Sequence, residues 1–164
     1  MTTLDAESAY LRLKDSVAAG IVGSPDLALI GVHSGGVWIA ERLKRDLALA
    51  SEMGTLSSAF HRDDYGSRGL PSQIKSTSLP FDVDGADIVL VDDILFTGRT
   101  VRAALNEIFD YGRPARVRLA VLIDRGGREL PVAADFCGLR HPLSAGEAFV
   151  LSRDTQGRFH LKIE

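Results

Sequence analysis

Apolar and polar positions along the chain follow alternating strand and helix patterns. Apolar runs at 27–32 and 88–91, and the mainly apolar segment 117–123, are typical of buried parallel strands. The segments after the first two runs, 37–47 and 100–111, space their apolar residues as one face of a helix does. Strands that alternate with helices predict an α/β fold, in which helices flank a doubly wound, mostly parallel sheet.

The two ends of the chain and its middle carry weaker patterns. We expect an amphipathic helix over 3–20, a strand over 54–60, and short strands at 149–151 and 159–163. Residues 61–80 are mainly polar and contain glycines and prolines, without a convincing helical pattern. A loop of this length inside a compact domain is usually functional or mobile.

Composition favours one globular domain over residues 1–164. The chain contains 45% hydrophobic and 25% charged residues, and neither a repeat nor a linker divides it. Its apolar stretches stop well short of the roughly 18 residues that a membrane span requires, and the N-terminus lacks a signal pattern. We therefore expect a cytoplasmic protein without a membrane partner, in which the single cysteine, Cys137, is a buried structural thiol.

The net charge and the histidine and cysteine spacing bear on two function classes, nucleic-acid binding and metal binding. The formal net charge of −3 gives no overall attraction to nucleic acid, so RNA binding would require a local basic patch. The four histidines and the cysteine show no metal-ligand spacing, and we expect no metal held by the protein's own side chains.

Candidate chemistry concentrates directly after the second apolar run. Asp92 and Asp93 are adjacent carboxylates, and carboxylates accept hydrogen bonds from vicinal hydroxyl groups. The following turn leads into a helix start, where unpaired amides and the helix dipole bind phosphate. This turn is formed by Thr97, Gly98, Arg99 and Thr100. Any one of these residues could merely end a strand or cap a helix, but together they predict a site for a ribose 5-phosphate.

Residues 91–100 resemble the phosphoribosyl pyrophosphate (PRPP) motif of type I phosphoribosyltransferases. Over roughly 27–138 the chain is similar to the PyrR family, pyrimidine operon regulators that are also uracil phosphoribosyltransferases. The likeness is carried by 91–104, 112–114, 119–131 and, upstream, 62–64. It implies the type I phosphoribosyltransferase fold with a small hood region. It also implies Mg²⁺-dependent transfer of the ribosyl 5-phosphate group from PRPP to uracil, which yields UMP and pyrophosphate.

The resemblance assigns roles to the two turns that follow the first two predicted strands. It implies that Asp92 and Asp93 hold the ribose hydroxyls, and that the turn 97–100 holds the 5-phosphate. It assigns the pyrophosphate to the turn formed by Ser34, Gly35 and Gly36. A glycine-rich turn between a strand and a helix can itself meet an anion, although such a pair of glycines is more commonly an ordinary tight turn.

Arg62 opens the polar segment, which resembles the loop that closes over the reaction centre in this family. Closure would exclude water from a reactive ribosyl intermediate, and Arg62 could neutralise charge on the departing pyrophosphate. The alternative for Arg62 is a solvated surface arginine. The roles of Asp63 and Asp64 stay open.

Asp124 and Arg125 follow the third predicted strand, where the resemblance places the nucleobase. Backbone groups there could recognise the carbonyl and N–H edge of uracil, and Asp124 could equally organise a turn with Gly126. No general base is evident in the sequence. A dissociative transition state gains most from stabilisation of the ribosyl cation and the leaving pyrophosphate, with Mg²⁺ bound mainly through PRPP or pyrophosphate.

Two alternatives stay open: a phosphoribosyltransferase for another nucleobase, and a UMP- or UTP-responsive regulator that binds pyr leader RNA with little enzymatic activity. RNA-binding members carry basic residues after the Asp-Arg-Gly turn, where this chain has Gly127, Ala133 and Leu139. The basic candidates that remain are Arg12, Lys14, Arg42, Lys44, Arg45, Arg128 and Arg140. The resemblance also implies a homodimer or a larger homo-oligomer.

Overall fold

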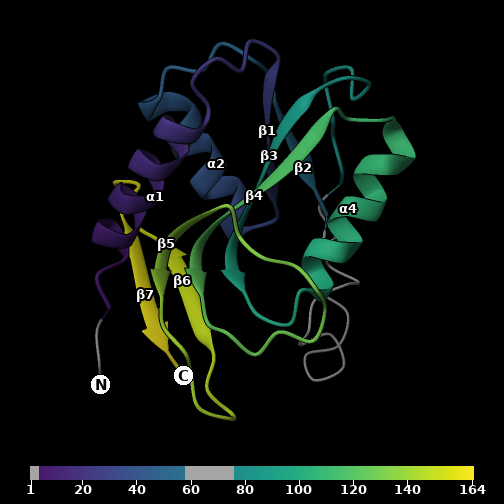
Figure 1. The fold of residues 1–164 in the computed structure, drawn as a ribbon. Helices are drawn as coiled ribbons and strands as arrows, with labels where there is room; N and C mark the ends of the chain where they lie inside the picture. Colours follow the sequence, from purple (N-terminus) through teal and green to yellow (C-terminus); the bar gives the residue numbers. More distant parts are fainter. Residues whose placement is uncertain (1–3, 58–75) are drawn as a thin grey trace.

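A parallel five-stranded sheet forms the centre of the computed structural model, which describes residues 4–57 and 76–164 (Figure 1). In spatial order the strands are β2 (Met53–Leu56), β1 (Leu27–Val32), β3 (Asp87–Leu95), β4 (Arg116–Asp124) and β5 (Phe136–Arg140). The chain runs from β1 outward to β2 and then crosses back to β3. Strand order therefore reverses between β1 and β3, and ligands bind at the carboxyl ends of strands at such a switch point.

Helices cover both faces of this sheet. α1 (Ala6–Gly20) and α2 (Gly35–Asp46) lie on one face, and α4 (Arg99–Tyr111) lies on the other (Figure 1). Neighbouring strand residues enter different cores: Val89 packs with α1 and α2, whereas Leu90 packs with α4. Both faces of the strands are buried, which is why they are continuous apolar runs. The predicted doubly wound, mostly parallel α/β sheet is confirmed.

A two-stranded antiparallel hairpin forms a small hood beside α1 and α2. It consists of β6 (Phe149–Arg153) and β7 (Phe159–Ile163). Phe159 and Leu161 point into the core that contains α1 and α2, and Leu4 forms an antiparallel bridge with Leu161. The hood is thus attached to the sheet domain by apolar burial.

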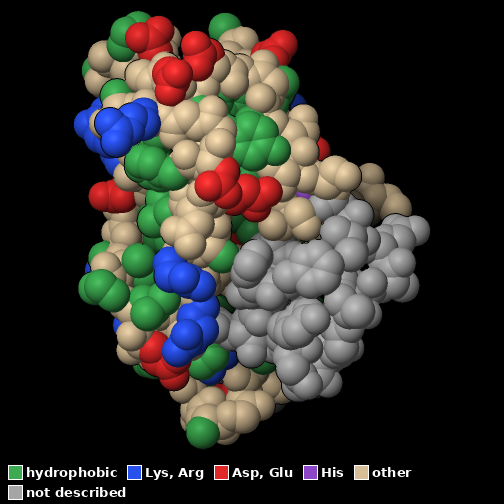
Figure 2. All heavy atoms as spheres, turned by 90° about the vertical axis from the view of Figure 1, so that its right-hand side faces the viewer, with side chains coloured by type: hydrophobic (Ala, Val, Ile, Leu, Met, Phe, Trp, Pro, Cys, Tyr) green, Lys and Arg blue, Asp and Glu red, His purple; other side chains and the backbone are tan. Residues whose placement is uncertain are grey.

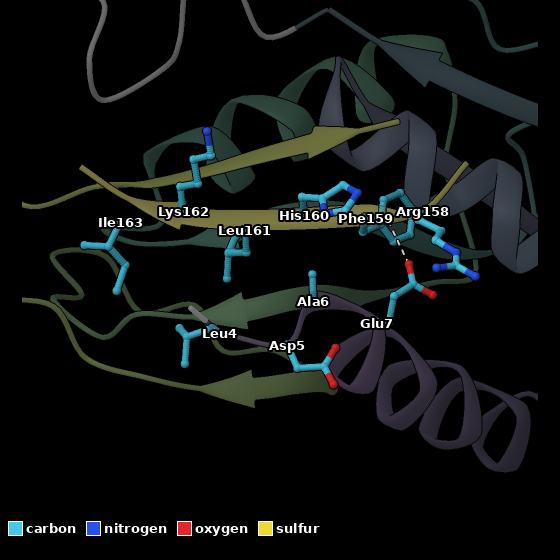
Figure 3. Close-up of a pocket in the computed structure, with 10 residues that line it drawn as sticks. All are labelled: Leu4, Asp5, Ala6, Glu7, Arg158, Phe159, His160, Leu161, Lys162 and Ile163. Atoms are coloured by element: carbon cyan, nitrogen blue, oxygen red, sulfur yellow. Dashed lines mark hydrogen bonds between the residues drawn. The ribbon is translucent and has the colours of Figure 1, made fainter. Parts of the chain in front are cut away.

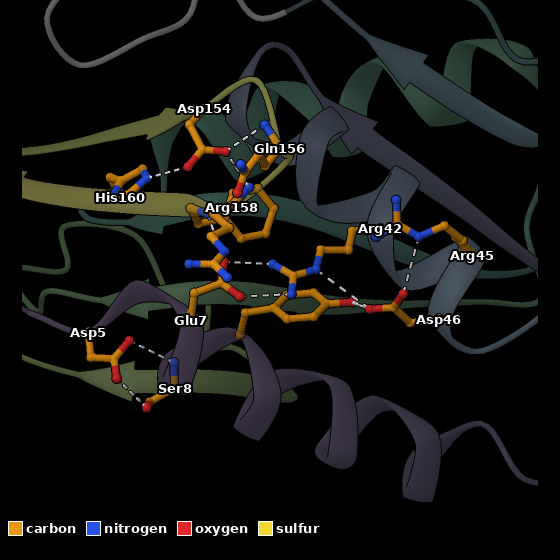
Figure 4. A network of polar contacts seen from close by, with 12 residues as sticks. Asp5, Glu7, Ser8, Arg42, Arg45, Asp46, Asp154, Gln156, Arg158 and His160 are labelled. Carbon is orange, nitrogen blue, oxygen red and sulfur yellow. Dashed lines mark hydrogen bonds and ion pairs between the residues drawn. The ribbon is translucent and has the colours of Figure 1, made fainter.

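A polar network fixes the hood to the two helices (Figure 4). Arg42 of α2 donates two hydrogen bonds to Glu7 of α1, at 2.7 and 2.8 Å, and Glu7 accepts another from the Phe159 amide at 2.7 Å. The Arg42 guanidinium lies 4.0 Å from the Tyr10 ring centroid, and the Tyr10 hydroxyl donates to Asp46 at 2.7 Å. The hydrogen bond from Arg42 lowers the pKa of Glu7, while burial and the Asp46 carboxylate raise that of Tyr10. Arg42 is therefore a structural cation.

Several predicted boundaries differ from the structure. β3 continues to Leu95, so Asp92 and Asp93 belong to a strand and not to the predicted loop. Pairing with β4 extends the strand, because Asp92 lies opposite Val121. β5 is not among the strands expected from the sequence pattern. The strand expected over 54–60 ends at Leu56, and the rest of that range lies mostly in 58–75, outside the described residues.

The described residues contain no helix that is both long and apolar enough to cross a membrane.

Candidate active site

The segment 34–36, predicted as a glycine turn, is the N-cap and first two residues of α2, and it packs directly on the strand that carries the two carboxylates. A Cβ atom on Gly36 would overlap the Val91 carbonyl oxygen and lie 3.0 Å from the Asp92 Cα. A Cβ atom on Gly35 would overlap the Asp93 carboxylate and lie 2.7 Å from its Cγ. Only glycine permits so close an approach. The structure thus brings the turn 34–36 together with Asp92 and Asp93 at the switch point.

The two carboxylates are held by their own backbone. Oδ1 of Asp92 accepts a hydrogen bond from the Asp93 amide at 2.9 Å, and Oδ1 of Asp93 accepts one from the Ile94 amide at 2.9 Å. Asp92 is only 6% exposed, whereas Asp93 is half-buried. Burial of a carboxylate is unfavourable unless hydrogen bonds compensate it. The strand therefore maintains two oriented acceptors at the end of the sheet, beside the glycine turn.

The turn before α4 has the geometry of an anion site. Gly98, the N-cap residue, has a φ of 96°, in the left-handed region that glycine adopts readily. The Arg102 amide donates to the Gly98 carbonyl at 3.0 Å, so the helical ladder begins there and the amides of 99–101 precede it. Thr97 is buried, and its hydroxyl accepts from the Arg99 amide at 3.2 Å. The first turn of α4 can therefore present its amides and the helix dipole to a phosphate.

The Arg99 side chain points toward the loop after β4. Its guanidinium donates to Glu129 at 2.7 and 3.1 Å, and both side chains are more than half exposed. Exposed ion pairs contribute little, about 0–1 kcal/mol, so this pair opposes reorientation only weakly. In the described geometry the Arg99 side chain therefore faces Glu129, and its amide is the group that lies in the first turn of α4, where it donates to the Thr97 hydroxyl.

Asp124, at the end of β4, organises the loop that follows. Its carboxylate accepts from the Gly126 amide at 3.0 Å and from Arg128 at 2.6 Å. Burial opposes ionisation, but these hydrogen bonds outweigh burial, and the pKa of Asp124 is lowered. Of the two roles left open by the sequence, the structure contains the turn with Gly126. The Arg125 guanidinium stacks 3.8 Å from the Phe96 ring centroid.

Comparison with known proteins identifies the family. The profile of the phosphoribosyl transferase domain matches residues 3–149. Bifunctional protein PyrR of Ralstonia nicotianae is 51% identical over 156 residues, which cover 94% of this chain and 89% of the relative. The chain belongs to the PyrR family of phosphoribosyltransferases. Bifunctional protein PyrR of Nitrosococcus oceani is 52% identical over 127 residues, which cover 76% of this chain and 72% of that relative.

Solved structures share the fold of this PyrR-family chain. A hypoxanthine phosphoribosyl transferase from Trypanosoma cruzi superimposes with a TM-score of 0.64 at 25% identity, covering 87% of this chain and 79% of the other. A hypoxanthine-guanine phosphoribosyltransferase from Bacillus anthracis reaches 0.67 at 18% identity, covering 87% and 85%. The expected type I phosphoribosyltransferase fold is confirmed.

The structure does not describe every predicted site residue of this PyrR-family chain. Arg62, Asp63 and Asp64 lie outside the described residues. Among the described ones, no group of three or more His, Cys, Asp or Glu side chains could hold a metal ion. Asp92 and Asp93 alone do not form a protein cage for Mg²⁺, but Mg²⁺ binds through few carboxylates when substrate phosphates supply the other oxygens. The residues present therefore fit an ion that arrives with PRPP.

Phe96 is a contact residue that was not among the site residues expected from the sequence. Its ring lies under the Arg125 guanidinium, and a Cβ atom on Gly127 would come within 2.6 Å of that ring. Its carbonyl oxygen accepts from Arg128 at 2.7 Å. The only sequence signal was a single aromatic residue between the carboxylates and the threonine turn. Phe96 thus forms part of the contact between the turn 97–100 and the loop after β4.

A separate groove of about 450 Å³ lies between the first turn of α1 and β7 (Figure 3). It is lined by residues 4–7 and 158–163, and it contains none of the predicted site residues. Leu161 and Phe159 extend from β7 toward α1, whereas Lys162 and His160 point to the other side of the strand (Figure 3). This groove belongs to the packing of the hood on α1.

Proposed function

We propose that this PyrR-family chain acts in the cytoplasm as a uracil phosphoribosyltransferase, which converts uracil and PRPP to UMP and pyrophosphate. The observation that carries this proposal is the direct packing of Gly35 and Gly36 on the strand segment that contains Asp92 and Asp93. PRPP has a diphosphate at one end of its ribose and a phosphate at the other. Two glycine-containing turns with two carboxylates between them match that distribution of charge and hydroxyl groups.

Each part of the site has a role in this proposal. Asp92 and Asp93 accept hydrogen bonds from the ribose 2- and 3-hydroxyls, and the first amides of α4 with the hydroxyls of Thr97 and Thr100 hold the 5-phosphate. The amides of the turn 34–36 face the pyrophosphate. With the sugar held at both ends, its anomeric carbon is fixed for attack by a base nitrogen as the bond to pyrophosphate breaks.

The electrostatics of the site favour the same reaction. Positive charge develops on the ribosyl ring in a dissociative transition state, and two oriented carboxylates stabilise it where water is excluded. Mg²⁺, bound through the diphosphate oxygens, would neutralise the leaving group. We assign Arg62 a similar role on the diphosphate. The nucleobase would lie beside the loop that begins at Asp124 and Arg125, whose backbone can recognise a carbonyl and N–H edge.

A nucleobase panel tests the proposal. Purified protein with PRPP and Mg²⁺ is supplied with each free nucleobase in turn, and pyrophosphate release is measured. We expect release with uracil and not with hypoxanthine or guanine. Release with a purine base alone would contradict the uracil assignment and leave the PRPP site standing, whereas no release with any base would contradict the enzymatic function.

Binding of pyr leader RNA is a second candidate function, and it is favoured by the name of the relatives, which are called bifunctional. The basic surface needed for it is limited. Arg12 donates to the Gly138 carbonyl at 2.9 Å, and Arg42 and Arg45 form ion pairs with acidic side chains. On the face that carries α4, Lys and Arg side chains form separate groups with acidic and apolar side chains between them (Figure 2). Salt-dependent binding to the cognate leader RNA, enhanced by UMP, would establish this function.

A further inference from the structure

Arg128 connects three segments of the site through one guanidinium group. Nη2 donates to Oδ2 of Asp124 at 2.6 Å, Nη1 donates to the Phe96 carbonyl oxygen at 2.7 Å, and Nε donates to the Val132 carbonyl oxygen at 3.1 Å. The side chain is 25% exposed. The acceptors belong to the end of β4, the turn before α4 and the segment after the loop. A residue that sequence reasoning kept as a candidate RNA contact is therefore committed to internal hydrogen bonds.

Two of these segments, the turn before α4 and the loop after β4, also meet through their backbones. The amides of Glu129 and Leu130 donate to the Thr97 carbonyl oxygen at 2.9 and 3.0 Å. A Cβ atom on Gly98 would overlap the Val132 side chain. The loop 124–132 therefore wraps around the turn that carries the phosphate-binding amides, and Arg128 lies between the two.

A guanidinium is suited to this position for geometric reasons. Its donors lie in one rigid plane, so it can hold several acceptors at fixed relative positions, whereas a lysine offers a single point of attachment on a flexible stem. Asp124 supplies a charged partner, and charge-assisted hydrogen bonds are stronger than neutral ones. The two carbonyl bonds then transmit this anchoring to Phe96 and Val132.

We propose that Arg128 is a positioning residue. It fixes the separation between the turn 97–100, which would hold the phosphate, and the loop 124–132, which would hold the base, so that both ends of a nucleotide bind at once. This inference rests on the proposed function, because it assumes that the phosphate and the base occupy those two segments. UMP engages both segments, whereas ribose 5-phosphate engages only the phosphate side. Loss of a positioning contact therefore affects the larger ligand more than the smaller one.

The test compares the affinities of UMP and ribose 5-phosphate by calorimetry in wild type and Arg128→Met. We expect UMP to bind about tenfold more weakly, in the range of coupling between residues of one network, and ribose 5-phosphate to bind within about twofold of wild type. Arg153→Met is the matched control, since Arg153 donates to Glu41 at 3.0 Å in the hood. It should leave both affinities unchanged.

Arg128→Lys keeps a positive charge near Asp124 but cannot reproduce the planar set of guanidinium donors. This variant provides the test if Arg128→Met does not fold. It should show the same selective loss for UMP, reduced to roughly a few-fold. Equal losses for both ligands would indicate a merely structural role, and no loss for UMP would equally overturn the proposal. Wild-type protein that binds ribose 5-phosphate but not UMP would contradict the uracil assignment alone, and the comparison would then use the purine nucleotide that binds.

Discussion

Replacement of both Asp92 and Asp93 by Asn is expected to lower kcat/KM for PRPP by about a thousandfold. Two charge-assisted hydrogen bonds to the ribose, each contributing about 2 kcal/mol, account for that factor. Loss of the negative charges beside the ribosyl cation lowers kcat further. The fold should persist, because an Asn oxygen can still accept from the amides of Asp93 and Ile94.

The measurement is steady-state pyrophosphate release together with a thermal melt of each variant. Asp110→Asn, at an exposed position on α4, is the matched control and should retain wild-type turnover. Each single substitution is expected to cost more than half of the transition-state stabilisation that the double substitution costs, since residues that act on one substrate group combine non-additively. A folded double variant with undiminished turnover would remove the ribose-site argument.

The second large effect is expected for Gly36→Ala. Its new methyl group would overlap the Val91 carbonyl oxygen and crowd the Asp92 Cα, and backbone atoms cannot rotate away as a side chain can. The turn after β1 must then move away from β3, at a cost of about 2–3 kcal/mol. For a chain of this size, that cost lowers Tm by roughly 4–12 °C. PRPP affinity should fall as well, because the two turns separate.

Gly146→Ala provides the control for Gly36→Ala. Gly146 has a φ of 87° and no heavy atom within 4 Å of an added Cβ, so alanine there meets strain without a clash. Its expected cost is about 1–2 kcal/mol, without an effect on PRPP affinity. If Gly36→Ala instead melted at the wild-type temperature and bound PRPP normally, the close contact between the turn 34–36 and β3 would be irrelevant to the site.

The sequence predicted the strands and helices that are marked by an apolar run or by a helix-end residue within the element itself. The run 27–32 coincides with β1, and the helix predicted over 100–111 ends at the same residue as α4, Tyr111. β5 was missed because Gly138 and Arg140 interrupt its apolar pattern. The structure supplies a long-range reason for that glycine, since a Cβ atom there would overlap the Ala9 carbonyl oxygen of α1.

The residues of the candidate site also differ in whether a local sequence feature indicates them. Adjacent carboxylates and a Thr-Gly turn are local features, so Asp92, Asp93 and the turn 97–100 could be proposed from sequence. The bonds of Arg128 join residues that are distant along the chain, such as Phe96, and from sequence alone Arg128 was only a basic candidate for RNA binding. Arg99 illustrates the reverse case, because the sequence placed it in a turn for phosphate, whereas its side chain in the structure pairs with Glu129.

The most direct test of the central claim is a crystal structure of the protein with bound UMP. We predict that the ribose hydroxyls lie within hydrogen-bond distance of the Asp92 and Asp93 carboxylates, with the 5-phosphate on the first amides of α4. The uracil ring should lie beside the loop that begins at Asp124. A nucleotide bound elsewhere, for example in the groove between α1 and β7, with the carboxylates untouched, would contradict the account.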